Sequence, residues 1–156
     1  MIEVSIDIDA APERVYQMVS DLPSMGKWSP ECYRCDWLAG ATAAEPGAKF
    51  IGHNRIGVRK WDTKGTVEVA DGREIAWSVR SVFNLPVSRW SYRVVDRPGG
   101  GSTLVESTED RRGTVIRTLG RLLLAGTGKG NRTMRNRETM NVTLQRLKEA
   151  AESTPR

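Results

Sequence analysis

The chain has 156 residues, of which 24 are Lys or Arg and 19 are Asp or Glu, so its formal net charge is +5. This length fits one core, and we expect residues 1–156 to form a single domain. A composition of 38% apolar and 28% charged residues excludes collagen-like, coiled-coil and disulfide-scaffold proteins. Five of the ten aromatic residues are Trp, so the fold must accommodate several large rings.

The start of the chain predicts a strand followed by two short helices. Val4, Ile6 and Ile8 alternate with polar residues, which is typical of a half-buried strand. Pro12 suits the first turn of a helix, where its missing N–H would have no partner. A second short helix or turn is expected over residues 22–28, where Trp28 would anchor the pair.

Residues 33–111 predict six strands joined by short turns. The expected strands are 33–38, 49–56, 60–70, 74–83, 88–95 and 102–110. Asp71-Gly72 is a strong hairpin signal, because both residues tolerate positive φ. Short connections between successive strands indicate an antiparallel meander.

The C-terminal part predicts a long helix whose inner face changes character. Met140, Leu144, Leu147 and Ala151 recur at helical spacing, and the same stripe continued backward reaches the polar Arg137. Such a face is expected to border a cavity at its polar end. The element order predicts an α+β fold in which a curved seven-stranded antiparallel sheet wraps around this one long helix.

Six short motifs follow one another along nearly the whole chain. They lie at 6–16 with Ala-Pro-Glu, 21–30 with Trp28, 46–50, 74–77, 100–106 and 143–148. Together they resemble the START-like helix-grip superfamily, and more narrowly its polyketide cyclase/dehydrase branch (SRPBCC). The resemblance implies a hydrophobic pocket under the long helix. Members of the superfamily bind lipids, sterols, hormones or polyketides, and some cyclise or dehydrate them. The resemblance carries over no catalytic residue, and region 111–130 departs from the family pattern.

Alternation along the strands places a set of side chains on the inner face of the sheet. The candidate ligand-binding residues are Asn54, Trp61, Trp77, Trp90 and Tyr92 on the strands and Arg137 on the helix. The rings suggest an aromatic-walled pocket, although core packing is the alternative for any one of them. Asn54 could orient a ligand carbonyl or satisfy a buried backbone group. The leading hypothesis is the binding of a hydrophobic or aromatic small molecule, polyketide-like or lipid-like, between the sheet and the final helix.

A polyketide cyclase or dehydratase acting on such a ligand is the enzymatic alternative. This chemistry needs a base near an acidic C–H and a donor for the enolate oxygen. Arg137, Tyr92 and Asn54 could donate, whereas the catalytic residues stay unknown. Glu106 or Glu109 would serve as the base only with an inward side chain, and two competing alternations in the last strand leave this open.

The positive charge is concentrated in segment 111–137, which holds eight basic residues and no acid. A third hypothesis is therefore a basic surface for a membrane or a protein partner. Nucleic acid is not expected, because the segment has no aromatic residue to stack on bases. A short helix over 115–125 and a gating loop at the glycine-rich 126–130 are further expectations. That loop does not fit the phosphate-binding loop motif.

Metal and cofactor sites are not expected. Cys32 and Cys35 supply two of the four ligands of a structural zinc, so reduced, inert thiols are predicted. His53 should face outward by alternation. The chain begins without a signal-like segment and contains no apolar run long enough to span a bilayer. We expect a cytoplasmic protein without an integral membrane segment, and a homodimer stays open.

Overall fold

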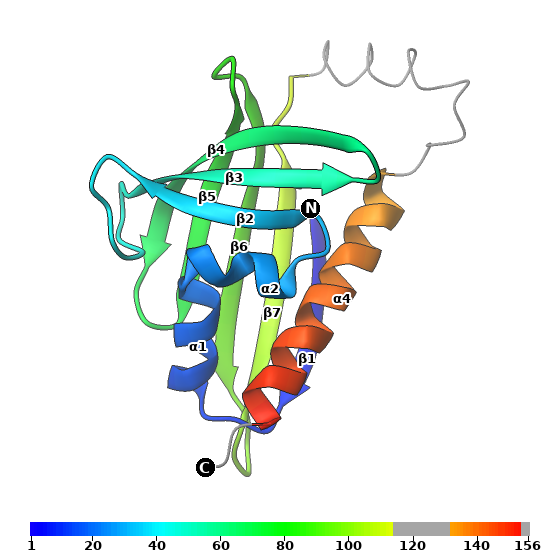
Figure 1. The fold of residues 1–156 in the computed structure, drawn as a ribbon. Helices are drawn as coiled ribbons and strands as arrows, with labels where there is room; N and C mark the ends of the chain where they lie inside the picture. The colour runs from blue at the N-terminus through cyan, green and yellow to red at the C-terminus, as the bar shows by residue number, and fades with distance from the viewer. Residues whose placement is uncertain (114–131, 154–156) are drawn as a thin grey trace.

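One curved sheet and one long helix make up most of the molecule (Figure 1). The computed structural model describes residues 1–113 and 132–153. The strands are β1 (Ile2–Ile8), β2 (Cys32–Leu38), β3 (Lys49–Ile56), β4 (Arg59–Ala70), β5 (Glu74–Ser81), β6 (Pro86–Asp96) and β7 (Ser102–Asp110). The helical elements are α1 (Pro12–Ser20), η1 (Leu22–Ser24), α2 (Met25–Trp28) and α4 (Arg132–Ser153).

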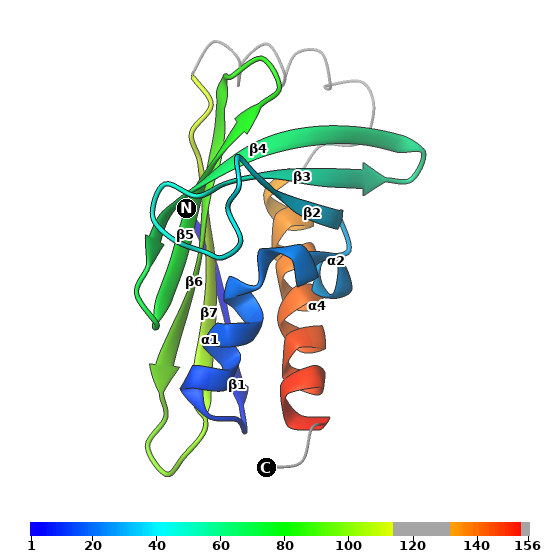
Figure 2. The same cartoon turned by 60° about the vertical axis from the view of Figure 1, so that its left-hand side comes forward.

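The sheet is a seven-stranded antiparallel meander with β1 added to its far edge. Its strand order is β1-β7-β6-β5-β4-β3-β2, and every neighbouring pair is antiparallel. Figure 2 shows α1, α2 and α4 on the same side of this sheet. The predicted α+β helix-grip architecture is thereby confirmed.

The predicted strand limits agree with the structure to within two residues. The strands predicted at 49–56 and 102–110 have the expected bounds. The fifth strand ends at Ser81 instead of residue 83, because a loop turns the chain there. Asn84 adopts a positive φ of 61° in that loop, a conformation that asparagine tolerates better than most residues.

The buried face of α4 divides the interior into two parts. Leu144, Leu147 and Ala151 pack into the main core, which also contains Ile8 and Leu104. This confirms the stripe predicted for the C-terminal half of the helix. The half that begins at Arg132 faces a cavity instead, as described below.

The short helices contact the C-terminal half of α4. Trp28, the last residue of α2, packs against the core, and its carbonyl accepts a 3.2 Å hydrogen bond from Arg146 Nη1 on α4. The predicted anchoring role of Trp28 is consistent with these contacts. No helix within residues 1–113 and 132–153 is long and apolar enough to cross a membrane.

Candidate ligand-binding site

A cavity of about 370 Å³ lies between the inner face of the sheet and the first half of α4. The helix contributes Asn136, Thr139, Met140 and Thr143 to its lining, and strands β2 to β7 contribute most of the rest of the described wall. Smaller parts come from the start of the chain, from the short helices and from Arg112 after β7. This volume falls within the range of small-molecule pockets in proteins.

The five strand residues predicted for the site all line this cavity, namely Asn54, Trp61, Trp77, Trp90 and Tyr92. The predicted alternation therefore brings them together. Arg137 is different, because it is exposed on α4 and is not among the described residues of the lining. In this part of α4 the cavity is lined by Asn136 and Thr139. The inward residue is therefore Asn136, one position before the predicted Arg137.

Aromatic rings form a continuous row along the wall. The Trp77 ring lies 5.8 Å from the Tyr92 ring and 6.2 Å from the Phe50 ring, which it meets nearly edge to face. The Trp90 indole N–H donates a 3.0 Å hydrogen bond to Ser88 Oγ. The wall thus combines large apolar rings with polar groups already paired at their edges.

Asn54 uses its amide nitrogen for the protein itself. Nδ2 lies 3.1 Å from the carbonyl oxygen of Gly52 and 3.2 Å from Thr63 Oγ1. These contacts favour the second interpretation of Asn54, in which it satisfies backbone and side-chain acceptors of β3 and β4.

Glu106 points into the cavity from the middle of β7. Its side chain is only 4% exposed, and Tyr92 Oη donates a 3.0 Å hydrogen bond to its Oε1. Its Oε2 has no hydrogen-bond partner within the described part of the chain. Burial raises the pKa of Glu106 to about 8, against the opposing effect of the Tyr92 hydrogen bond. Of the two bases considered, Glu106 faces inward, whereas Glu109 is exposed and pairs with Arg111.

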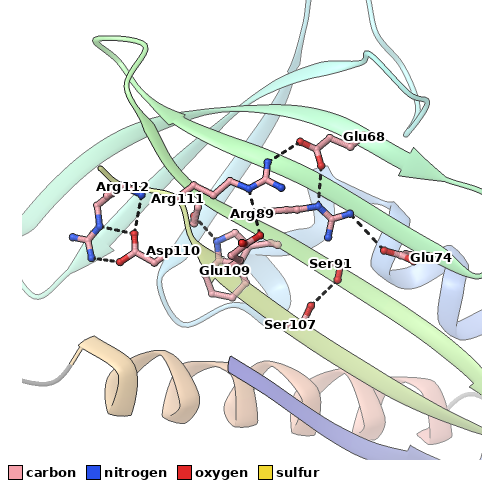
Figure 3. A network of polar contacts seen from close by, with 11 residues as sticks. Glu68, Glu74, Arg89, Ser91, Ser107, Glu109, Asp110, Arg111 and Arg112 are labelled. Carbon is pink, nitrogen blue, oxygen red and sulfur yellow. Dashed lines mark hydrogen bonds and ion pairs between the residues drawn. The ribbon is translucent and has the colours of Figure 1, made fainter. Parts of the chain in front are cut away.

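An ion pair lies at the edge of the cavity. Arg112 donates to both carboxylate oxygens of Asp110, at 2.9 and 2.6 Å (Figure 3), and both residues line the cavity. The hydrogen bond with Asp110 raises the pKa of Arg112. The sequence indicates a basic segment but does not reveal this ion pair, which depends on where the chain leaves β7.

Residues 114–131, with the predicted helix 115–125 and loop 126–130, lie outside the described residues.

The two cysteines also border the cavity. A register shift between Cys32 and Arg34 brings Cys32 and Cys35 to the same side of β2, and both line the cavity as free thiols. Burial raises their pKa values to about 11 and about 12, so both are uncharged at neutral pH. No group of three metal-ligating side chains occurs in residues 1–113 or 132–153.

His53 faces away from the cavity, as predicted. Its two ring nitrogens lie 3.2 Å from Asp36 Oδ2 on β2 and 2.8 Å from Asp62 Oδ1 on β4. It therefore bridges the two strands that flank β3, and it has no place in the site.

A curved antiparallel sheet that grips a C-terminal helix over a cavity defines the START-like helix-grip class. The chain belongs to the family described as polyketide cyclase / dehydrase and lipid transport, whose model matches residues 1–152. This confirms the resemblance to the polyketide cyclase/dehydrase branch. No curated protein matches the sequence.

Solved structures with the same fold include proteins of several kinds. The di-domain ARO/CYC StfQ from the steffimycin biosynthetic pathway is 12% identical with a TM-score of 0.68, and the match covers 97% of this chain and 45% of StfQ. The chain thus spans less than half the length of that protein. The Polyketide_cyc-like protein Cgl2372 from Corynebacterium glutamicum is 28% identical with a TM-score of 0.55, over 97% of this chain and 90% of Cgl2372. A major latex-like protein from Panax ginseng is 10% identical with a TM-score of 0.69, over 96% and 95% of the two chains.

Proposed function

We propose that this domain binds a hydrophobic or aromatic small molecule, polyketide-like or lipid-like, between the sheet and α4. The observation that carries the proposal is the cavity of about 370 Å³ with its row of aromatic rings. Family membership supports it, as does the likeness in fold to two ARO/CYC proteins of biosynthetic pathways, StfQ and BexL.

The ring geometry suits a flat, apolar occupant. Trp77 and Tyr92 both line the cavity, with ring centroids 5.8 Å apart, and a planar ligand would gain contact area with such rings. The lining contains two polar sites, the buried acid Glu106 and the Asp110–Arg112 ion pair. Such isolated polar groups would fix the orientation of a ligand whose binding energy comes mainly from apolar contact.

The proposal can be tested by filling the cavity from the helix. Thr139 lines the cavity, whereas Val142, three residues further along α4, is exposed. The neutral fluorophore N-phenyl-1-naphthylamine should bind saturably to the unmodified protein and to the V142W variant. T139W should bind it about tenfold more weakly or worse, because the indole would occupy the same space. If the folded T139W variant binds the fluorophore as well as V142W does, the cavity is not the binding site.

A second candidate function, cyclisation or dehydration, is favoured by the inward position of Glu106. In a dehydration, its carboxylate would take a proton from the carbon beside a ketone, and the resulting carboxylic acid would return that proton to the β-hydroxyl, which leaves as water as the C=C bond forms. Because the reaction needs the carboxylate, its rate should increase as the pH rises through the pKa of about 8. Incubation with 4-hydroxy-4-phenylbutan-2-one should yield 4-phenylbut-3-en-2-one, and the E106Q variant should not produce it. Product formation at the same rate in E106Q would exclude this role.

A further inference from the structure

We propose that Glu106 makes the cavity selective for ligands with a carbonyl oxygen, to which the carboxylic acid donates a hydrogen bond from Oε2. The ligand class would be aryl ketones, quinones and similar polyketones. This inference rests on the proposed function, because it requires that the cavity hold a small molecule.

The two carboxyl oxygens of Glu106 differ in their hydrogen bonding. Oε1 accepts the Tyr92 hydroxyl at 3.0 Å, whereas Oε2 is buried and has no hydrogen-bond partner in residues 1–113 and 132–153. A buried polar atom without a partner costs free energy. Since Glu106 lines the cavity, a ligand group that pairs with Oε2 would remove this cost.

The Tyr92 contact determines which oxygen carries the proton. A phenol has one proton, and its 3.0 Å contact with Glu106 Oε1 is far shorter than its 4.0 Å contact with Met25 Sδ. The pKa of Tyr92 is raised by burial, so the phenol keeps that proton and donates it to Oε1. The acid proton of Glu106 then lies on Oε2, and this atom acts as a donor toward the cavity.

The surroundings of Glu106 favour the uncharged acid. From β2 the cavity receives the thiols of Cys32 and Cys35, which are uncharged at neutral pH because burial raises their pKa values. The described lining from α4 consists of Asn136, Thr139, Met140 and Thr143, none of which carries a charge. The remaining ionisable groups of the described lining are the N-terminal amine of the exposed Met1, the carboxyl of Glu31 before β2, the phenol of Tyr92 and the Asp110–Arg112 pair. The cation of that pair is held by its own carboxylate at 2.6 Å.

The aromatic rings would supply the apolar contacts of the ligand, beside the hydrogen bond from Glu106. Trp77 lies next to Tyr92, and Tyr92 bonds to Glu106, so the acid is adjacent to the aromatic wall. A planar ligand lying along the rings can therefore place a carbonyl at the acid. A hydrocarbon of the same shape would make the ring contacts and leave Oε2 unpaired.

The test compares 9-fluorenone with fluorene, two planar molecules that differ in one carbonyl group. Affinities are measured by displacement of N-phenyl-1-naphthylamine. Well below the pKa of about 8, the unmodified protein should prefer fluorenone by about tenfold, the usual worth of one hydrogen bond. Well above that pKa the preference should disappear, because a carboxylate cannot donate and repels the carbonyl oxygen.

Two variants separate hydrogen bonding from shape. E106Q keeps an N–H donor that does not titrate, so its preference for fluorenone should persist at both pH values. E106L has no donor and should bind both compounds alike at both pH values. A preference for fluorenone that survives in E106L, or one in the unmodified protein that does not change with pH, would overturn the inference.

If fluorene and fluorenone bind equally well to the unmodified protein, only the inference fails. If neither displaces the fluorophore, and the fluorophore itself does not bind, the proposed function fails as well.

Discussion

The ring of Phe50 on β3 lies directly against the α-carbon of Gly65 on β4. The two residues are paired across the strands, and a Cβ atom at position 65 would overlap three carbons of the Phe50 ring. Phe50 also meets Trp37 and Trp77 edge to face, at centroid distances of 6.0 and 6.2 Å. Gly65 therefore makes room for the ring that connects the edge of the sheet to the cavity wall.

Replacing Gly65 by Ala should destabilise the protein by about 1–3 kcal/mol, the usual cost of overpacking. The methyl group would displace Phe50 and disturb its contacts with Trp37 and Trp77. Urea unfolding measures the change. G52A is the matched control, because a Cβ at Gly52 would come no closer than 3.3 Å, to Thr63 Oγ1. Equal losses in the two variants would show that the Phe50 contact is not the cause.

Glu106 should make the stability of the protein depend on pH. Its pKa is about 8 in the folded state against 4.5 for the ordinary group, so between these values the folded protein holds a proton that the unfolded chain releases. The free energy of unfolding should consequently fall as the pH rises from 4.5 to about 8, by at most about 1.4 kcal/mol per pH unit. Above that range the contribution of Glu106 should level off.

The E106Q variant isolates this contribution, because glutamine has a similar shape and does not titrate. Urea unfolding at a series of pH values should give a flatter curve for E106Q than for the unmodified protein over this interval. The same slope in both proteins would mean that Glu106 is ionised in the folded state, contrary to its burial.

The ring positions of the site were predictable from the sequence because a strand alternates with a period of two residues. Trp61, Trp77 and Trp90 follow from that rule alone, once their strands are recognised. Trp61 and Trp90 lie in regularly paired stretches, and the register shift beside Trp77 is on its partner strand β4, so counting along each strand gives the correct face.

Other members of the lining depend on features that a single sequence does not reveal. The inward side of β7 was ambiguous because Val105 is buried on the opposite face, although Leu104 and Glu106 face inward. Cys32 and Cys35 share a side only because of the register shift between Cys32 and Arg34. Trp37 had no predicted place, since its contact with Phe50 depends on how β2 pairs with β3.

A cluster of ion pairs on the other face of the sheet should contribute modestly to stability. Arg89 Nε lies 2.8 Å from Glu68 Oε2, and its Nη2 lies 3.7 Å from Glu74 Oε1 (Figure 3). These groups are partly exposed, so R89A should lower the free energy of unfolding by no more than about 1 kcal/mol. R93A, at an exposed position of the same strand, should have a smaller effect. A loss in R93A as large as that in R89A would argue against a specific contribution from the cluster.

The two cysteines should react slowly with iodoacetamide in the folded protein. The thiolate is the reactive form, and burial raises the pKa values of Cys32 and Cys35 to about 11 and about 12. Near neutral pH the folded protein should therefore be alkylated much more slowly than the same protein in urea, where the thiols regain ordinary acidity.

The C32S and C35S variants allow each thiol to be followed alone by mass spectrometry. Of the two, Cys35 is buried and Cys32 only partly buried, so C32S, which retains Cys35, should react more slowly than C35S. Rapid alkylation of either variant in the folded state would show an activated thiolate, and the assignment of the pair as inert would then be wrong.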